Sequence, residues 1–255
     1  MKYIPFLSSV HQLVKPERYL EIGIRTGKSL ALSTCRSVGI DPAYSLTAEL
    51  NTHVTLFRTT SDEYFSRPST LAVTDGEPFD LTFIDGMHLF EFALRDFINT
   101  ERNSRRTSVI VFDDVLPRTV DEAARERHTN AWTGDVYPII DVLAQYRPDV
   151  ATILVDTEPT GLFLVVGLDP ASTVLADNYE EIMREYRHAD PQPVPEALLN
   201  RVGVQSPQRV LDAQFWKVLA EERTNAAGAD FARRLRHQLA ADFGPRYDAQ
   251  PGQYA

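Results

Sequence analysis

The sequence predicts an α/β fold, in which helices pack on a mostly parallel β-sheet. Strand-like and helix-like segments alternate up to about residue 167, which is the pattern of α/β proteins. Asp85 in FDLTFIDG and the pair Asp113-Asp114 in TSVIVFDDV each close a predicted strand, at the strand end where open sheets bind ligands. The last two predicted strands are joined by the short turn DTEPTG, which favours an antiparallel final pair.

The predicted strands are short apolar runs bounded by turn residues. In chain order they cover residues 19–23, 38–41, 53–58, 79–85, 108–114, 150–155 and 161–167. The fourth run, FDLTFID, is typical of a strand that is buried on both faces.

The predicted helices follow from apolar residues at helical spacing and from capping residues. Between the strands we expect helices at about 27–36, 61–65, 87–98 and 136–143, and a helix-prone stretch within the polar segment 118–134. Asp135 is the expected N-cap of the helix that begins at residue 136. After residue 170 we expect helices at about 177–188, 195–201, 207–222 and 228–243.

The chain is therefore expected to divide into three parts. Residues 1–170 form the α/β domain, 171–245 a helical extension, and 246–255 a disordered tail. An apolar stripe on the extension, made by Leu211, Phe215, Val218 and Leu219, must pack on something. It either caps the active site or forms a homodimer contact, and the sequence leaves both open.

Composition excludes several classes of partner. The formal net charge is −10, from 26 basic and 36 acidic residues, which disfavours nucleic acid and anionic membranes because both require a basic surface. The first 20 residues contain no apolar run long enough for a signal peptide or a membrane span. The single cysteine, Cys35, rules out an intramolecular disulfide and fits a reducing cytoplasm.

The three strand-end aspartates predict a cation site. If their strands are neighbours, the backbones lie about 4.8 Å apart, and each pair of carboxylates about 4 Å apart repels by about 4 kcal/mol at an effective dielectric of about 20. Protons or a cation must offset this repulsion, and an all-oxygen set favours a hard ion, most simply Mg²⁺. The alternative is that one aspartate caps a helix and the others are solvated.

The first strand-loop-helix, Glu21 to Ser29, contains a glycine turn. Arg25 stands where a dinucleotide fingerprint requires its second glycine, which argues against NAD or FAD. The stretch GIRTGKS is one residue short of a P-loop, so a P-loop enzyme remains an alternative. Glu21 and Asp41 are 20 residues apart, a spacing that places the second carboxylate on a ribose hydroxyl pair. Glu21 is then placed to bind a ligand ammonium, unless the glycines form only a plain tight turn.

Several motifs of this chain together resemble those of the class I S-adenosylmethionine-dependent methyltransferases. They are YLEIGIRTG, VGIDP, TTSDEYF, FDLTFIDGMHLFEFALRDF and VIVFDDVLP. More narrowly, the chain resembles the metal-dependent small-molecule O-methyltransferases, which include catechol-type enzymes and enzymes acting on sugars of macrolide and aminocoumarin antibiotics. The resemblance covers about residues 19–167. Two departures are Arg25, in place of a common glycine, and the loop RNSRRTS, which lacks the usual Pro-Gly pair.

The resemblance implies a Rossmann-like seven-stranded sheet with an antiparallel last strand, S-adenosylmethionine as cofactor, and Mg²⁺ or Mn²⁺. The expected metal ligands are Asp85, Asp113 and Asp114. The expected cofactor-binding residues are Glu21, Gly23, Gly27, Asp41, Ser61 and Asp85.

His88 stands three residues after Asp85, where the catechol-type enzymes place a basic residue, so the resemblance implies a catalytic pair of Asp85 and His88 with His88 as general base. We expect His88 in the first turn of the following helix, facing the pocket. Its alternative role is a helix N-terminal hydrogen bond or a substrate contact. Trp132 and Asp135 are expected to line the acceptor pocket, although Asp135 is also a candidate helix cap.

Three functions are therefore compatible with the sequence. The leading one is a metal-assisted O-methyltransferase of secondary metabolism that acts on a hydroxyl of a sugar, a phenol or another small molecule. The second is a P-loop phosphotransferase or nucleotide hydrolase, and the third is a non-catalytic ligand-binding protein on the same fold.

Overall fold

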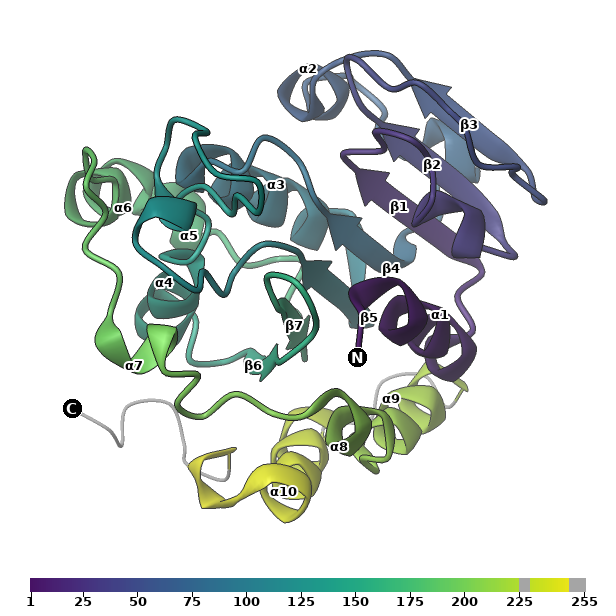
Figure 1. Ribbon diagram of the computed structural model, residues 1–255. Helices are drawn as coiled ribbons and strands as arrows, with labels where there is room; N and C mark the ends of the chain where they lie inside the picture. Colours follow the sequence, from purple (N-terminus) through teal and green to yellow (C-terminus); the bar gives the residue numbers. More distant parts are fainter. Residues whose placement is uncertain (225–229, 248–255) are drawn as a thin grey trace.

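A seven-stranded sheet with helices on both faces forms the centre of the computed structural model (Figure 1), which describes residues 1–224 and 230–247. The strands lie in the order β3-β2-β1-β4-β5-β7-β6. Their bounds are β1 Arg18–Ile22, β2 Arg36–Ile40, β3 Val54–Phe57, β4 Phe79–Ile84, β5 Ser104–Phe112, β6 Ala151–Val155 and β7 Leu162–Val166. β1 to β5 pair in parallel, whereas β7 runs antiparallel to both β5 and β6. The predicted α/β class and antiparallel last strand are confirmed.

The central strands are apolar because both faces of the sheet are covered. All six residues of β4 are buried, and successive side chains alternate between the two faces. Ile84 and Phe112 pack on one face, and Phe83 and Val111 pack on the other. A strand with this environment reads as a continuous apolar run.

One face of the sheet is covered by helices that follow β3, β4 and β5 and by the first helices of the C-terminal extension. They are α2 Ser61–Phe65, α3 Phe90–Arg102, α4 Ile139–Tyr146, α5 Val174–Asp177, α6 Tyr179–Tyr186 and α7 Glu196–Leu199. α3 buries Phe90, Leu94 and Phe97 in this layer, as its helical spacing predicts. The short 3₁₀ turns η2 Ala72–Thr74 and η3 Asp121–Ala123 lie in the connections.

The other face is covered by both ends of the chain. This layer contains α1 Tyr3–Val14, η1 Leu30–Leu32, α8 Pro207–Leu211, α9 Phe215–Thr224, α10 Phe231–Phe243 and η4 Pro245–Tyr247. Figure 1 shows α8, α9 and α10 grouped on the same side as α1. Phe215 and Leu219 of the predicted stripe are buried here, and Leu211 and Val218 pack beside them. The stripe therefore covers the sheet, and a homodimer contact stays a prediction.

Two helical predictions are wrong, and the single helix predicted at 207–222 is divided into α8 and α9. Instead of a helix over 27–36 there is only η1, because the hydroxyls of Ser33 and Ser37 bond to backbone and side-chain atoms of residues 33–35 and so compete with helical bonds. The helix-prone stretch after residue 118 contains only η3. In the other direction, α1 was not expected, although its buried Phe6, Val10 and Val14 follow helical spacing. Most of the predicted disordered tail lies outside the described residues. Among the described helices, none is long and apolar enough to cross a membrane.

Candidate functional site

The carboxyl ends of the central strands form the framework of the site. Ile22, Ile84 and Phe112 pair across β1, β4 and β5. The ladder continues one residue further, since the amide of Asp85 donates to Ile22 O (2.8 Å) and the amide of Asp113 donates to Ile84 O (3.0 Å). The strand-end aspartates are therefore brought to one edge of the sheet, as the sequence predicts.

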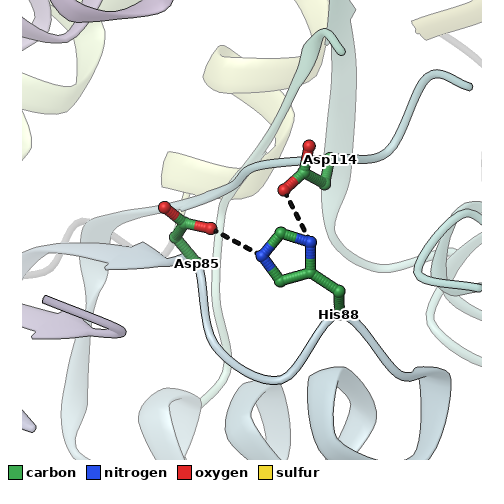
Figure 2. A group of neighbouring side chains, drawn as sticks. All are labelled: Asp85, His88 and Asp114. Carbon is green, nitrogen blue, oxygen red and sulfur yellow. Dashed lines mark ion pairs between the residues drawn. The ribbon is translucent and has the colours of Figure 1, made fainter. Parts of the chain in front are cut away.

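Asp85, His88 and Asp114 converge at this edge, as Figure 2 shows. The imidazole lies between the two carboxylates, with Nε2 3.1 Å from Asp85 Oδ1 and Nδ1 3.0 Å from Asp114 Oδ2. One ligand atom from each of the three residues lies within 4.8 Å of the others. Their side chains are 12–26% exposed, so the cluster is mostly buried but accessible to solvent.

The electrostatics of this cluster favour a positive charge at its centre. Burial lowers the pKa of His88, but hydrogen bonds and charges from Asp114 and Asp85 raise this pKa well above its ordinary value. Burial and the charge of Asp114 raise the pKa of Asp85, while His88 and Arg25 lower it. The two carboxylates therefore favour a positive charge between them, and the imidazole of His88 lies at that position in this structure.

His88 is not in the first turn of a helix as predicted. It has a left-handed backbone (φ 55°), and α3 begins two residues later, at Phe90. The segment after β5 packs against it: the ring of Trp132 stacks on the imidazole at 4.9 Å and 5°, and Trp132 O lies 3.1 Å from Nδ1. Gly134 is essential to this contact, because a Cβ at this position would stand 1.7 Å from His88 O.

The predicted acceptor residues have other partners in the structure. Trp132 has His88 on its ring and the Arg127 guanidinium 5.9 Å from the same ring. Asp135 is completely buried. Its Oδ1 accepts from the amide of Phe90 (3.1 Å), and its Oδ2 accepts from Arg125. Asp135 therefore caps α3, across 45 residues of sequence, rather than the helix that follows it.

Arg125 joins the Trp132 segment to α3. Its guanidinium binds Asp135 and also both oxygens of Glu91, at 2.6 Å and 3.1 Å. Its backbone amide donates to both carboxylate oxygens of Asp190, at 3.1 Å and 3.0 Å. The wall beside His88 is thus tied to α3 and to the C-terminal extension.

Asp113 lies beside the cluster but is not among the three residues that converge. Its Oδ1 accepts the amide of Asp114 (2.9 Å), and burial together with the charges of Asp114 and Asp85 raises the pKa of Asp113 well above its ordinary value. Its role as a metal ligand remains a prediction.

The glycine turn after β1 is shaped by close backbone packing. Gly23 has φ +88°, and a Cβ there would stand 1.8 Å from the carbonyl oxygen of Asp85. Gly27 has φ +79° and lies against the side chain of Leu46. Asp41 supports the turn by accepting from the amides of Ile24 (2.9 Å) and Arg25 (2.7 Å). The Asp41 carboxylate also accepts from the amide of Ala43 (2.6 Å), and its role at the ribose remains a prediction.

Glu21 and Ser61, both expected to contact the cofactor, have protein partners. Glu21 is completely buried and accepts from the hydroxyls of Tyr19 and Ser29, each at 2.7 Å. Burial raises the pKa of Glu21 to about 8. A ligand ammonium would have to replace one of these hydroxyls. Ser61 begins α2, and its hydroxyl interacts with the buried carboxyl of Asp96.

Sequence reasoning missed Tyr3. Its ring stacks on Phe83 of β4 at 6.3 Å. Burial and the charges of the strand-end carboxylates, led by Asp113, raise the pKa of Tyr3. α1 therefore brings a phenol to the same edge of the sheet, and no local signal in the sequence could have located it there.

The donor set fits a divalent cation. Two carboxylates supply hard oxygen ligands, which suit Mg²⁺ and Mn²⁺, and an imidazole is compatible with several transition metals. The loop that would hold an adenosine cofactor does not fit a P-loop, because a P-loop leads into a helix whose N-terminus binds phosphate, and here only the three-residue turn η1 follows.

Residues 20–115 match the methyltransferase domain family. Among solved structures, an O-methyltransferase from Bacillus cereus in complex with SAH is 19% identical, with a TM-score of 0.48, and the alignment covers 64% of this chain and 79% of that one. An O-methyltransferase of tomaymycin synthesis from Streptomyces achromogenes, in complex with SAM, is 23% identical, with a TM-score of 0.47 and coverage of 64% and 78%. An SAH-bound methyltransferase from Podospora anserina is 14% identical, with a TM-score of 0.45 and coverage of 64% and 77%. No curated protein matches the sequence.

Proposed function

We propose that this chain, which belongs to the class I S-adenosylmethionine-dependent methyltransferases, transfers the methyl group to a hydroxyl oxygen of a small molecule with the help of a divalent cation, Mg²⁺ or Mn²⁺. The convergence of Asp85, His88 and Asp114 at the carboxyl edge of β4 and β5 carries the proposal. This edge is where open α/β sheets bind their ligands.

The residues of the cluster have distinct roles in this proposal. Asp85 and Asp114 hold the cation, with Asp113 beside them. When bound, the cation lowers the pKa of the acceptor hydroxyl and orients it. Alignment of the two reactants in one pocket supplies about 7–11 kcal/mol of the barrier reduction. Asp41 and the turn containing Gly23 and Gly27 bind the cofactor.

His88 is the proposed general base. In the structure it is hydrogen-bonded to both carboxylates, and a protonated imidazole cannot accept a proton. It becomes a base only when another positive charge offsets Asp85 and Asp114. Base catalysis by His88 and cation binding therefore belong to one proposal.

The acceptor in this proposal is a small molecule; the net charge of −10 disfavours nucleic acid and an anionic membrane, both of which require a basic surface. Three further parts of the proposal rest on the sequence alone. The acceptor is a secondary metabolite with a sugar or phenol hydroxyl, the protein is located in the cytoplasm, and it forms a homodimer. A screen of such acceptors with isotope-labelled methyl donor identifies the substrate.

The cofactor is tested by calorimetry with S-adenosylhomocysteine. We expect binding, which Asp41→Ala weakens through loss of ribose hydrogen bonds, while Glu49→Ala, an exposed residue of the same segment, leaves it unchanged. Binding of ATP without binding of S-adenosylhomocysteine would reject the proposed cofactor.

The cation is tested by chelation. Turnover should vanish in excess chelator and return with Mg²⁺ or Mn²⁺. Asp85→Asn and Asp114→Asn should weaken Mn²⁺ binding in calorimetry, whereas Asp121→Asn, at an exposed position, should not. Full turnover in excess chelator by metal-free protein would refute this part.

His88 is tested by two substitutions. His88→Ala should lower turnover by about 10²-fold or more with little change in cofactor affinity, and the exposed His128→Ala is the control. If His88→Asn keeps most of the turnover and mainly raises the acceptor KM, His88 positions the acceptor instead. Near-normal rates in both variants would leave the cation as the source of activation.

A further inference from the structure

Asp96 is a buried carboxyl for which the proposed chemistry gives no role. It lies on the inward face of α3, and only 2% of the residue is exposed. Its helical neighbours on that face, Ala93, Leu94 and Phe97, are apolar and buried. Among the described residues, Asp96 Oδ1 has no hydrogen-bond partner. Burying a polar group without a partner costs free energy that an apolar residue would avoid.

Asp96 lies directly beneath the turn that carries the site. A Cβ added to Gly86 would stand 3.3 Å from Asp96 Oδ2, so the carboxyl lies close to Gly86, the first of the two residues between Asp85 and His88. A cavity of about 10 Å³ lies here, and its polar lining comes from Asp85, His88, Asp96, Asp113 and Asp114. Roughly 10–15 Å³ is the smallest volume that holds one water molecule, and the water needs two to four polar partners.

We propose that this cavity is a binding site for one internal water molecule, which donates one hydrogen bond to Asp96 Oδ1 and the other to a carboxylate of the cluster. A water can join two acceptors that would otherwise repel each other. Asp96 is then a positioning residue: through the water it fixes the turn from Asp85 to His88. The consequence for cation binding rests on the proposed function, whereas the water site does not.

The proposal explains why the turn has its local geometry. Gly86 has no side chain, so the turn can approach Asp96 closely, and the left-handed His88 redirects the chain above the cavity. Groups that orient metal ligands from behind commonly change metal affinity or activity by about 10–100-fold when they are removed. The same size of effect is expected for Asp96.

A crystal structure of the metal-free protein, at a resolution that shows ordered water, tests the site directly. We expect one water at hydrogen-bonding distance, about 2.7–3.2 Å, from Asp96 Oδ1. In Asp96→Asn, whose side chain keeps an acceptor oxygen, the water should remain. In Asp96→Leu and Asp96→Ala the contact should be lost and the turn from 85 to 88 should shift. A dry cavity in the wild type, or a protein group bonded directly to Asp96 Oδ1, would overturn the proposal.

Calorimetric titration with Mn²⁺ tests the positioning role. Asp96→Leu or Asp96→Ala should weaken Mn²⁺ binding by about 10-fold or more, and Asp96→Asn should remain close to wild type.

The matched control is Asp80→Leu. Asp80 is also 2% exposed and accepts from the amides of Glu17 (2.9 Å) and Arg18 (3.1 Å) at the other end of β4. It should lower the melting temperature but leave Mn²⁺ binding unchanged. If Asp80→Leu and Asp96→Leu weaken Mn²⁺ binding equally, the effect of Asp96 is only structural, and the proposal that it positions the turn from Asp85 to His88 is overturned. If wild type binds no Mn²⁺, the proposed function fails, while the crystal structure still decides the water site.

Discussion

Arg125→Met removes the charge that connects the Trp132 segment to α3 while it keeps most of the apolar stem. The guanidinium binds Asp135, which is completely buried, and Glu91, whose side chain is 14% exposed. Asp135 in turn accepts the amide of Phe90 at the start of α3. The substitution therefore leaves a buried carboxylate without its cation and weakens the contact that holds the wall beside His88.

The magnitude follows from the burial of the pair. Removing one partner of a buried ion pair costs about 3–5 kcal/mol. Burial raises the pKa of Asp135 to about 6 even though Arg125 lowers it, so without Arg125 this carboxyl takes up a proton near neutral pH instead of remaining charged. Protonation limits the loss to the lower end, about 3 kcal/mol. For a chain of this size, that loss lowers the melting temperature by about 6–12 °C.

Differential scanning calorimetry of two matched variants tests the estimate. Arg118→Met breaks a second ion pair of the same segment, to Glu122, but the Arg118 side chain is 51% exposed and that of Glu122 is 9% exposed, so solvent screens this pair more and the expected loss is smaller than for Arg125→Met. Adding Asp135→Asn to Arg125→Met should restore part of the stability, because the neutral amide needs no cation and can still accept the amide of Phe90. Equal effects of Arg125→Met and Arg118→Met, or strict additivity in the double variant, would refute the reasoning.

Three further outcomes follow from single residues. Burial lowers the pKa of His11 to about 4, so between pH 6.5 and 4 the unfolded chain binds more protons than the folded protein. The free energy of unfolding should therefore fall by up to about 3 kcal/mol as the pH decreases through this window. Urea unfolding of His11→Phe should not show this loss. Glu21, with a pKa of about 8 raised by burial, has the opposite sign: the folded state binds more protons, so stability falls by about 1.4 kcal/mol per unit as pH rises from about 4.5 to 8, and Glu21→Gln should be the more stable protein at pH 8. Gly134→Ala should lose turnover and stability because its Cβ meets His88 O, whereas Gly76→Ala, which meets nothing within 4 Å, should cost only about 1–2 kcal/mol of left-handed strain; equal effects in calorimetry would contradict the contact argument.

The sheet was predictable because its signals are local. The apolar run FDLTFID marks β4, whose six residues are all buried, and the short turn DTEPTG marks the antiparallel pair of β6 and β7. The helix predicted at 27–36 failed because short-range hydroxyl contacts around Ser33 and Ser37 outweighed its helical propensity. The layer formed by α1 with α8, α9 and α10 joins the two ends of the chain, and no local pattern encodes that pairing.

The site was predictable only to the level of strand ends. Because β4 and β5 are neighbours, Asp85 and Asp114 had to lie close together. The position of His88 depends on its left-handed backbone and on Trp132, 44 residues away. The contacts of Asp135 with Phe90 and Arg125 are likewise tertiary. The sequence therefore predicted Asp135 as a pocket residue and as the cap of the helix that follows it, whereas it caps α3.

These tertiary contacts hold residues whose backbone conformation is strained. Arg25, His88 and Asp114 all have left-handed backbones without being glycine, with φ of 50°, 55° and 59°. Each costs on the order of 1–3 kcal/mol and persists only where surrounding structure over-determines it. The loops after β1, β4 and β5 each contribute one such residue, so three of the six left-handed non-glycine residues among those described lie at the edge where the carboxylates meet.

Each of these left-handed residues is held in place by a hydrogen bond or a packing contact. Asp41 accepts the amides of Ile24 and Arg25, and Asp113 accepts the amide of Asp114. His88 is enclosed by Trp132 and by Gly134, and Arg125 holds that segment in place from behind. Two carboxylates that repel each other would separate on flexible loops. Rigid, strained loops keep Asp85 and Asp114 close enough to share one cation, which is the property that the proposed chemistry requires.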